Sequence, residues 1–407
     1  MASANVSTSR RGFLRTSAAA SAALPLASAW ANDPTQPGEV RRYATLGRTG
    51  YEISDVSFGT ASLRPGQEDL VHHALDRGIN YFDTAESYTG GNSEIALGRA
   101  LKGKRDQVVI TSKVMQEPDS SAEWLMEMLE GSLRRLQMDY VDIYMNHAVN
   151  DLAVVRNPEW HAFMDRAKEQ GKIRFSGMSG HAGHLVDCLE YAFEEDLVDA
   201  VLVAHNFGQD PKFFERVTRS MDWVATQQDL PRALAKGRAK GVGVTVMKTL
   251  RGARLNDMRP FEKDGATYAQ AALRWVLSNP DVDGAVITMN SVEKIDEFLG
   301  ASGWEKLAYG DMDLLERYAH LNKETYCNNV CNDCAGACPY GVPIQEVLRT
   351  RMYAVDYQDV DFARREYAML ATNAEACLSC DGQPCANACT HGIAIDRFCG
   401  PTHSLLA

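Results

Sequence analysis

Four polar side chains with complementary chemistry follow three successive β-rich runs of this sequence. Asp83 and Tyr88 follow the first run, Lys113 ends the second, and His147 follows the third. Taken singly, an acid at a strand end is more often a helix cap, and a lone histidine more often a packing residue. Together, the ammonium lowers the phenol pKa while the carboxylate orients the ammonium. The four residues therefore predict a proton-transfer site, provided that the three runs end at one edge of a sheet.

Eight short β-rich runs supply the strands that would position these residues. They are residues 56–59, 79–82, 108–111, 140–144, 173–176, 200–203, 242–246 and 285–288. Most are separated by stretches of helical periodicity, such as 122–136 and 267–278. A doubly wound sheet is the competing topology, but its G-x-G-x-x-G motif is missing after the first run. We therefore predict an α/β fold, a (β/α)8 TIM barrel over residues 41–321, with a β-hairpin at 43–53 closing its N-terminal end.

Length and charge exclude several classes of protein. The chain has 407 residues, 54 acidic against 42 basic, and a formal net charge of −12. No cluster of Lys and Arg is present to meet a phosphate backbone, so we expect no nucleic-acid partner. The one long apolar stretch, residues 18–31, is shorter than the ~20 residues that cross a bilayer.

The N-terminus resembles a twin-arginine export signal. Arg10 and Arg11 precede Phe13, Leu14 and an Ala-rich stretch, and small residues at 27–31 suit cleavage by a signal peptidase. The alternative is a basic, Ala-rich tail without that role. We predict a signal peptide over residues 1–31, a Pro-containing linker over 32–40, and a periplasmic or otherwise exported protein.

Residues 41 to about 300 resemble the aldo-keto reductase family. The matching segments are 43–50, 82–85 with Tyr88, 91–94 with 97–98, 112–113, and 141–144 with His147. The resemblance implies that Tyr88 is the general acid that protonates a carbonyl oxygen. It also implies that Lys113 and Asp83 tune Tyr88, that His147 orients the carbonyl, and that the hydride comes from NADP(H) at the barrel mouth.

The cofactor-binding positions match that family less well. Ser179 remains of the Ser-Asn pair that holds the nicotinamide amide, but Gly180 replaces the Asn. Leu202 replaces the Gln, and Met247 stands at the position of the stacking aromatic ring. The residues assigned to cofactor binding are Ser179, Asn206, Lys248 and Lys294, although Asn206 alternatively caps a turn and either lysine alternatively lies on the solvated surface.

Nine of the ten cysteines lie after residue 326, and eight of them form two sets of four. The sets are Cys327, Cys331, Cys334 and Cys338, and Cys377, Cys380, Cys385 and Cys389. A short internal repeat relates C-P-Y-G-V-P-I at 338–344 to C-T-H-G-I-A-I at 389–395. Residues 322–407 thus resemble a dicluster ferredoxin-type [4Fe–4S] domain. The resemblance implies that Cys338 and Cys389 exchange partners, each completing the other set's cluster.

Three other interpretations of the cysteines remain open. Two zinc sites would use the same C-x2-C pairs. Disulfides suit an exported protein, but the close pairs would form very tight rings. One set binding a cluster while the other is structural would explain the irregular second spacing. Cys399 lies outside both sets, and Cys188 falls in a barrel helix, where a buried free thiol is expected.

The two halves predict an oxidoreductase of the aldo-keto reductase type, with a small carbonyl or alcohol substrate. A nicotinamide transfers two electrons as hydride, whereas a [4Fe–4S] cluster transfers one at a time. In one account, NADP(H) or the clusters with an external electron-transfer partner drive the reaction. In the other, the molecule is an exported electron-transfer protein whose barrel is a docking or inactive scaffold.

Overall fold

The computed structural model describes ten stretches of the chain. They are residues 38–181, 184–209, 229–250, 258–262, 267–303, 307, 309–322, 334–355, 360–390 and 392–407. The predicted signal peptide, most of the linker, Cys327 and Cys331 lie outside the described residues. No helix within the described stretches has the length and apolar composition that a membrane span requires.

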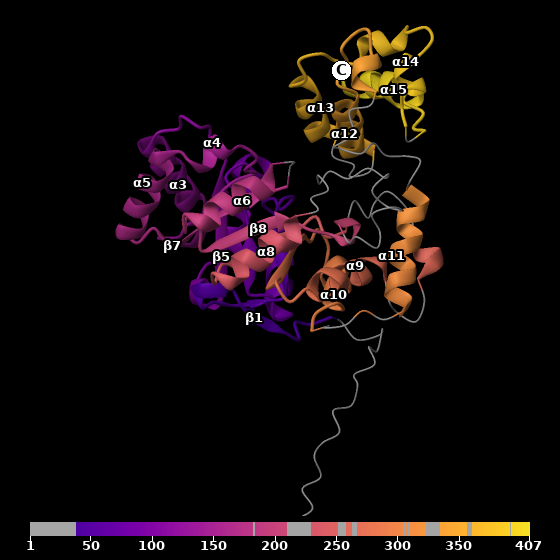
Figure 1. The fold of residues 1–407 in the computed structure, drawn as a ribbon. Helices are drawn as coiled ribbons and strands as arrows, with labels where there is room; N and C mark the ends of the chain where they lie inside the picture. The colour runs from indigo at the N-terminus through magenta and orange to yellow at the C-terminus, as the bar shows by residue number, and fades with distance from the viewer. Residues whose placement is uncertain are drawn as a thin grey trace, which may run out of the picture.

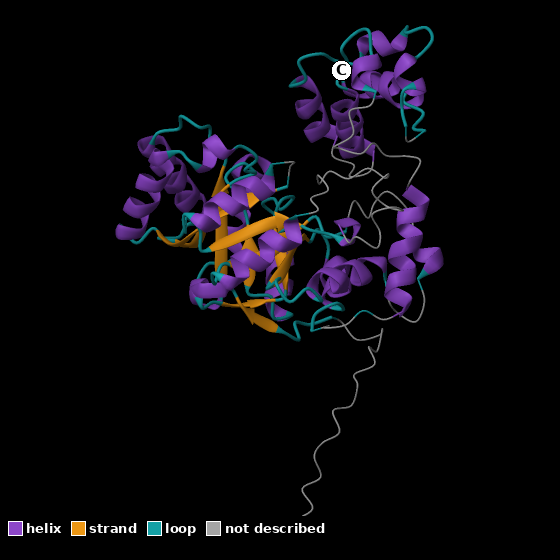
Figure 2. Cartoon of the chain, viewed as in Figure 1, coloured by secondary structure: helices purple, strands orange, loops and turns teal. Residues whose placement is uncertain are grey.

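Eight parallel strands close into a barrel in the order β10-β3-β4-β5-β6-β7-β8-β9. The strands are β3 (Val56–Gly59), β4 (Tyr81–Asp83), β5 (Val109–Val114), β6 (Val141–Asn146), β7 (Ile173–Gly180), β8 (Ala200–Ala204), β9 (Gly243–Met247) and β10 (Gly284–Thr288). Each predicted run contributes one strand, so the TIM-barrel prediction is confirmed. The barrel forms the core of the larger unit in Figures 1 and 2.

Helices cover the outside of the barrel (Figure 2). They are α1 (Glu68–Asp76), α2 (Asn92–Ala100), α3 (Ala122–Leu136), α4 (Leu152–Val155), α5 (Pro158–Glu169), α6 (Leu185–Glu194), α8 (Leu230–Ala239), α9 (Tyr268–Leu277) and α10 (Val292–Leu299). Polar side chains begin several of them. Ser121 caps α3, Thr267 caps α9 and Ser291 caps α10, each accepting a hydrogen bond from a backbone N–H of the first turn.

The hairpin ahead of the barrel is also present. Strands β1 (Tyr43–Thr45) and β2 (Glu52–Ser54) pair antiparallel around the short helix η1 (Gly47–Thr49). Leu46 and Ile53 are fully buried and pack with interior residues of the barrel such as Tyr81 and Ile143. The hairpin therefore closes the N-terminal end of the barrel.

Helix α11 (Tyr309–Asn322) packs against α9 rather than on the strands (Figure 1). Leu314, Leu315 and Tyr318 form an apolar cluster with Phe207 and Tyr268, and the Tyr268 and Tyr318 rings stack at 4.3 Å. A buried ion pair between Arg274 and Asp311, 2.8 Å long, fixes the two helices in this arrangement.

The C-terminal residues form a second, helical cluster, drawn in yellow at the end of the chain in Figure 1. Its elements are η6 (Ala335–Ala337), α12 (Ile344–Val355), α13 (Val360–Ala368), η7 (Glu375–Leu378), α14 (Pro384–Asn387) and α15 (Asp396–Leu406). Its own apolar core contains Val347, Met352, Ala363 and Ile395. Helix α12 packs against both α13 and α15.

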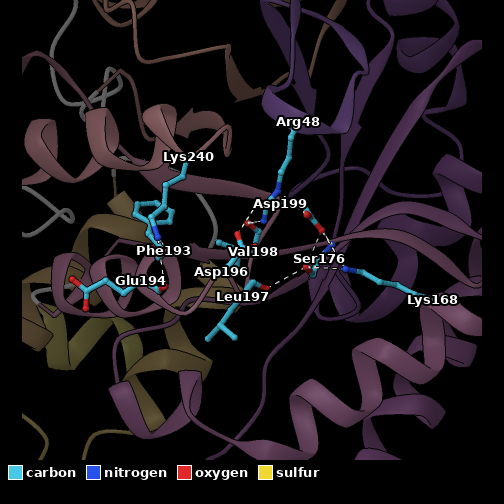
Figure 3. Close-up of polar contacts among 10 residues, drawn as sticks. All are labelled: Arg48, Lys168, Ser176, Phe193, Glu194, Asp196, Leu197, Val198, Asp199 and Lys240. Atoms are coloured by element: carbon cyan, nitrogen blue, oxygen red, sulfur yellow. Dashed lines mark hydrogen bonds and ion pairs between the residues drawn. The ribbon is translucent and has the colours of Figure 1, made fainter.

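One carboxylate joins the hairpin to two barrel strands (Figure 3). Asp199, just before β8, accepts hydrogen bonds from Arg48 Nε at 3.0 Å and from the Ser176 amide at 2.9 Å. Lys168 lies 3.3 Å from the same carboxylate. Burial opposes ionisation of Asp199, but the Ser176 amide and Lys168 outweigh it, so the pKa of Asp199 lies below its ordinary value.

Replacing Asp199 with Asn should lower the free energy of unfolding by about 2 kcal/mol at neutral pH, because Arg48 and Lys168 lose a charged acceptor. The folded-state pKa of Asp199 is depressed, so its contribution is present above the unfolded pKa and disappears as pH falls through the folded pKa. Urea unfolding of wild type and variant at neutral and acid pH measures this. A stability difference that stays constant with pH would contradict the ionic role, and the more exposed Asp196→Asn serves as control.

Candidate functional site

The structure brings the four predicted catalytic residues together at the carboxyl ends of three neighbouring strands. Asp83 ends β4, Lys113 lies near the end of β5, and His147 directly follows β6. Tyr88 begins the short helix η2 (Tyr88–Gly91) in the loop after β4. Because all eight strands are parallel, these ends share one rim of the barrel.

The Lys113 ammonium is the centre of this group. It donates to Asp83 Oδ1 at 2.7 Å, to the Thr84 carbonyl at 2.6 Å and to the Tyr88 hydroxyl at 3.4 Å. The Lys113 side chain has no exposed surface. Burial alone would lower the pKa of Lys113, but Asp83 and Tyr88 raise it above its ordinary value. Lys113 is therefore a buried cation held directly beside the phenol.

The pKa of Tyr88 departs from the sequence-based expectation. The Lys113 ammonium lowers it, as expected, and lies 4.7 Å from the centre of the Tyr88 ring. Burial raises it by more, so the net pKa lies above that of a free phenol and not nearer to neutrality. The expectation of a net downward shift was wrong, because the sequence identifies the neighbouring charge but not the extent of desolvation. Tyr88 is a protonated phenol at neutral pH.

His147 completes the group as a neutral imidazole. Its ring meets the Tyr88 ring edge to face, with centroids 5.6 Å apart. Burial lowers the pKa of His147 well below its ordinary value, and the charges of Lys113, His181 and Lys248 lower it further. The Nδ1 atom is buried and has no hydrogen-bond partner among the described residues. At neutral pH one ring nitrogen therefore carries a proton that it can donate.

Three residues at this rim have left-handed backbone conformations that are uncommon outside glycine. They are Thr89 with φ +51°, Ala148 with φ +56° and Lys248 with φ +57°. They directly follow Tyr88, His147 and Met247, respectively. Such backbone strain gathers at functional sites, where surrounding structure holds it in place.

The structure around Ser179 and Gly180 explains why the family's amide-binding Ser-Asn pair is incomplete. Ser179, the last residue but one of β7, is buried, and its hydroxyl accepts a hydrogen bond from the Ala148 amide at 3.1 Å. At Gly180 a Cβ would come within 2.5 Å of Leu185 Cδ1 and 2.7 Å of the Val149 carbonyl oxygen. No larger side chain fits there, so the Asn cannot be accommodated in this backbone.

Two other candidate cofactor residues are engaged in local structure. Asn206 donates to the Lys248 carbonyl at 3.4 Å and accepts from the Gly208 amide at 3.0 Å, which is the turn-capping alternative. Lys294 pairs with Glu297 at 2.6 Å. The Lys248 side chain, by contrast, interacts electrostatically with His147 and so belongs to the rim.

Two polar residues after the carboxyl ends of the strands were not predicted as site residues. Glu86 accepts from the Met115 amide at 3.2 Å, while its second carboxylate oxygen is buried without a hydrogen-bond partner in the described part of the chain. The buried Thr249 hydroxyl, just after β9, likewise has none there. Glu86 lies within the 83–88 motif, and Thr249 follows a β-rich run. Only this position after a predicted strand could have marked the two residues as candidates.

These features fit a nicotinamide group at the barrel mouth. The half-buried Met247 ends β9 and packs on the barrel interior, and a thioether packs favourably against an aromatic ring. The unpartnered Thr249 hydroxyl and the Ser179 hydroxyl are polar groups that can bind an amide. Met247, Thr249 and Ser179 differ from the family's residues, but they supply an apolar surface and hydrogen-bonding atoms.

Comparison with known proteins agrees with this geometry. The model for the "Aldo/keto reductase family" matches residues 55–256, which include β3 to β9 and all four clustered residues. The barrel is an aldo/keto reductase domain. The enzyme is accordingly an oxidoreductase of the aldo-keto reductase type.

Individual relatives cover about two thirds of the chain. L-galactose dehydrogenase of Arabidopsis thaliana is 29% identical over 297 residues, 63% of this chain and 86% of the relative. Aldo-keto reductase YhdN of Bacillus subtilis is 26% identical over 305 residues, 64% of this chain and 89% of its own length. A Klebsiella pneumoniae aldo-keto reductase solved in complex with NADPH is 25% identical, with a TM-score of 0.54, covering 69% of this chain and 96% of that one.

Some of the described C-terminal cysteines lie in neighbouring elements. Cys385 interacts electrostatically with Cys338 and Cys377, and η6 of the first set contacts α14 of the second. Cys380 is directed elsewhere, toward the Asp381 carbonyl. The eight described cysteines are free thiols. Among described residues no three His, Cys, Asp or Glu side chains are grouped to hold one metal ion.

The two segments of the internal sequence repeat also have similar backbone turns. After Cys338 and after Cys389 the chain turns through a glycine with positive φ, +64° at Gly341 and +68° at Gly392. The two glycine amides donate to the Cys338 and Cys389 carbonyls, respectively. The Cys389 sulfur also accepts the Ile393 amide at 3.4 Å. Backbone N–H groups aimed at sulfur stabilise thiolates, so this turn suits a cluster ligand.

A double-mutant cycle tests whether Asp83 and Lys113 are ionised partners. Lys113→Met leaves a buried carboxylate unpaired and should cost about 3–5 kcal/mol of unfolding free energy. Adding Asp83→Asn should recover part of that loss, because no unpaired charge then remains. Chemical denaturation of the single and double variants measures the coupling. Additive losses would mean that the two groups do not stabilise each other as charges.

Proposed function

We propose that the barrel reduces the carbonyl group of a small molecule with NADP(H), or oxidises the corresponding alcohol, with Tyr88 as the general acid or base. The observation that carries the proposal is the buried Lys113 ammonium, which contacts both the Asp83 carboxylate and the Tyr88 hydroxyl. A protonated phenol beside a fixed cation can give its proton to a carbonyl oxygen and remain as a stabilised phenolate. The NADPH bound by the Klebsiella relative supports the choice of cofactor.

Each residue has a distinct task in this proposal. Tyr88 donates the proton, and Lys113 stabilises the phenolate that forms. Asp83 fixes the position of the Lys113 ammonium. The neutral imidazole of His147 donates a hydrogen bond to the carbonyl oxygen and orients it. A bound reduced nicotinamide supplies the hydride, with Ser179, Met247 and Thr249 as the residues that would hold its ring.

Replacing Tyr88 with Phe should reduce the rate of carbonyl reduction by about 10²- to 10⁴-fold, the usual value of a positioned general acid. The phenol ring remains, so the free energy of unfolding should change little. Steady-state kinetics with a panel of aldehydes and ketones, beside thermal unfolding, measures both effects. Tyr43→Phe is the matched control, because that hydroxyl, as far as the chain is described, bonds to the Gly78 carbonyl on the surface. Unchanged turnover in Tyr88→Phe would refute the assignment.

We further propose that the C-terminal segment binds [4Fe–4S] clusters and that the protein is exported by the twin-arginine route, where a folded protein already carries its cofactors. The N–H bond to Cys389 and the approach of Cys338 to Cys385 support the cluster assignment. In a [4Fe–4S] cluster each thiolate binds a different iron, so sulfurs farther apart than zinc ligands are suitable. Outside the cytoplasm such clusters would exchange electrons with a partner protein.

A second candidate function has one observation in its favour. Gly180 leaves no room for the amide-binding Asn, and Leu202 lies in the apolar barrel interior. A barrel that binds nicotinamide weakly suits an exported electron-transfer protein with an inactive or docking scaffold. The contrast between the complete Asp83–Lys113–Tyr88–His147 group and the incomplete amide site leads us to favour the enzyme.

Anaerobic titration of the full-length protein with NADPH and NADH distinguishes the candidates. We expect nicotinamide fluorescence to report binding and the visible absorbance of the clusters to bleach as electrons enter them. Binding without bleaching would separate the reductase from the clusters. An absence of binding would contradict the NADP(H) proposal and favour the electron-transfer protein. Protein without iron or sulfide would contradict the cluster assignment while leaving the barrel proposal intact.

A further inference from the structure

The loop between β4 and η2 is fastened to the end of β5 by hydrogen bonds at every second residue. The Thr84 amide donates to the Thr111 carbonyl at 2.9 Å, and the Glu86 amide donates to the Lys113 carbonyl at 3.2 Å. The third bond uses a side chain, because the Met115 amide donates to Glu86 Oε1 at 3.2 Å. Glu86 therefore holds the backbone of this segment at Lys113 and again two residues beyond it.

The course of the chain explains why a side chain makes the third bond. Strands β4 and β5 pair as far as Asp83, and the next two backbone bonds continue that parallel ladder beyond the end of β4. At Glu86 the chain enters a tight turn, since the Tyr88 amide donates to the Ala85 carbonyl at 3.2 Å. The backbone turns away from β5 there, and the Glu86 carboxylate accepts the Met115 amide in its place.

This fastening acts on the contact between Tyr88 and Lys113. The ammonium bond to the Tyr88 hydroxyl is 3.4 Å long, whereas the bonds to Asp83 and to the Thr84 carbonyl are 2.7 and 2.6 Å. Asp83 belongs to β4 itself, but Tyr88 lies in the turn that Glu86 joins to β5. A hydrogen bond weakens steeply as it lengthens, so a small displacement of this turn would break the Tyr88 bond first.

The Glu86 carboxylate lies in an environment that is unfavourable for its charge. Its Oε2 atom is buried without a hydrogen-bond partner in the described part of the chain. Burial raises the pKa of Glu86, and the nearby Glu94 carboxylate adds to this, while the Met115 amide opposes it. The Glu86 charge in turn adds to the effect of burial in raising the pKa of Tyr88. A glutamine could accept the same amide without the charge, so the bond and the charge can be separated by substitution.

We propose that Glu86 is a positioning residue that fastens the turn of Tyr88 to β5 and so keeps the Tyr88 hydroxyl in contact with the Lys113 ammonium. This inference rests on the role proposed for Tyr88. Glu86 neither gives nor takes a proton in the reaction, and its bond to the Met115 amide matters more than its charge. Without that bond, the Tyr88 phenolate that forms after proton donation loses part of its stabilisation by Lys113.

Two substitutions of similar size and equal charge test the proposal in the full-length protein. Glu86→Gln keeps an acceptor for the Met115 amide, whereas Glu86→Met removes it. We expect kcat for carbonyl reduction to fall about tenfold in Glu86→Met and by no more than about threefold in Glu86→Gln, the range of one hydrogen bond. Ser120→Ala is the matched control and should change nothing, because the Ser120 hydroxyl accepts the Glu117 amide at 3.0 Å in the same loop after β5.

A second measurement needs neither cofactor nor substrate. NMR of protein with tyrosine isotope-labelled at Cζ follows the ionisation of the Tyr88 phenol, and Tyr88→Phe assigns its signal. Loss of the Glu86 charge lowers the pKa of Tyr88 in both variants, whereas a weaker contact with Lys113 raises it. Tyr88 should therefore ionise at lower pH in Glu86→Gln than in wild type, and at higher pH in Glu86→Met than in Glu86→Gln. A residue that only supported the fold would leave the two variants alike.

Equal rates and equal titration of Tyr88 in the two variants would overturn the proposal, because the bond to Met115 would then have no effect on the phenol. A Glu86→Gln rate as low as that of Glu86→Met would assign the effect to the charge instead. Glu86→Ala, which also lacks an acceptor, replaces Glu86→Met if thermal unfolding shows that variant to be unfolded. Wild-type protein that reduces no carbonyl compound would contradict the proposed function, whereas the titration would still test the position of Tyr88.

Discussion

The buried ion pair between Lys113 and Asp83 is the interaction on which the candidate active site depends. Two charges without solvent contact are stable only when each is close to the other and further hydrogen bonds satisfy what remains. The Thr84 carbonyl supplies one such bond at 2.6 Å. Displacing either charge would leave the other unpaired in an apolar interior, so the pair holds the ends of β4 and β5 in one geometry. The proton-transfer role proposed for Tyr88 depends on that geometry.

The barrel meets this requirement because its strands are closed and parallel. β4 and β5 pair through Asp83 and Thr111, which brings Lys113 two residues farther along beside the end of β4. At the opposite end, the hairpin and the Asp199 hydrogen bonds join β7 and β8 to residues before the barrel. Apolar packing at Leu46 and Ile53 fills the interior below the site. The active end is therefore supported by contacts that do not take part in its chemistry.

The sequence could predict the barrel and the clustered residues because both depend on simple rules. Eight β-rich runs imply eight strand ends at one rim, so Asp83, Lys113 and His147 had to converge. The individual cofactor residues were harder, because a polar residue in a loop can bind backbone as readily as ligand, as Asn206 does. The net pKa shift of Tyr88 is a difference between burial and charge, and only the charge was visible in the sequence. The packing of α15 against η7 likewise depends on long-range contacts, among them the hydrogen bonds of Tyr367 to His403 and Ala374.

The proposed pairing of a hydride-transfer barrel with one-electron clusters raises the question of how two electrons would be handled. A hydride delivers both electrons at once, and a cluster accepts one, so two clusters together match the stoichiometry of one hydride. If both clusters had the same potential, neither would be preferred as the first acceptor. The two four-cysteine sets differ in the spacing of their first three members, so the two proposed sites are chemically unequal. Unequal sites would define an order in which electrons fill the unit.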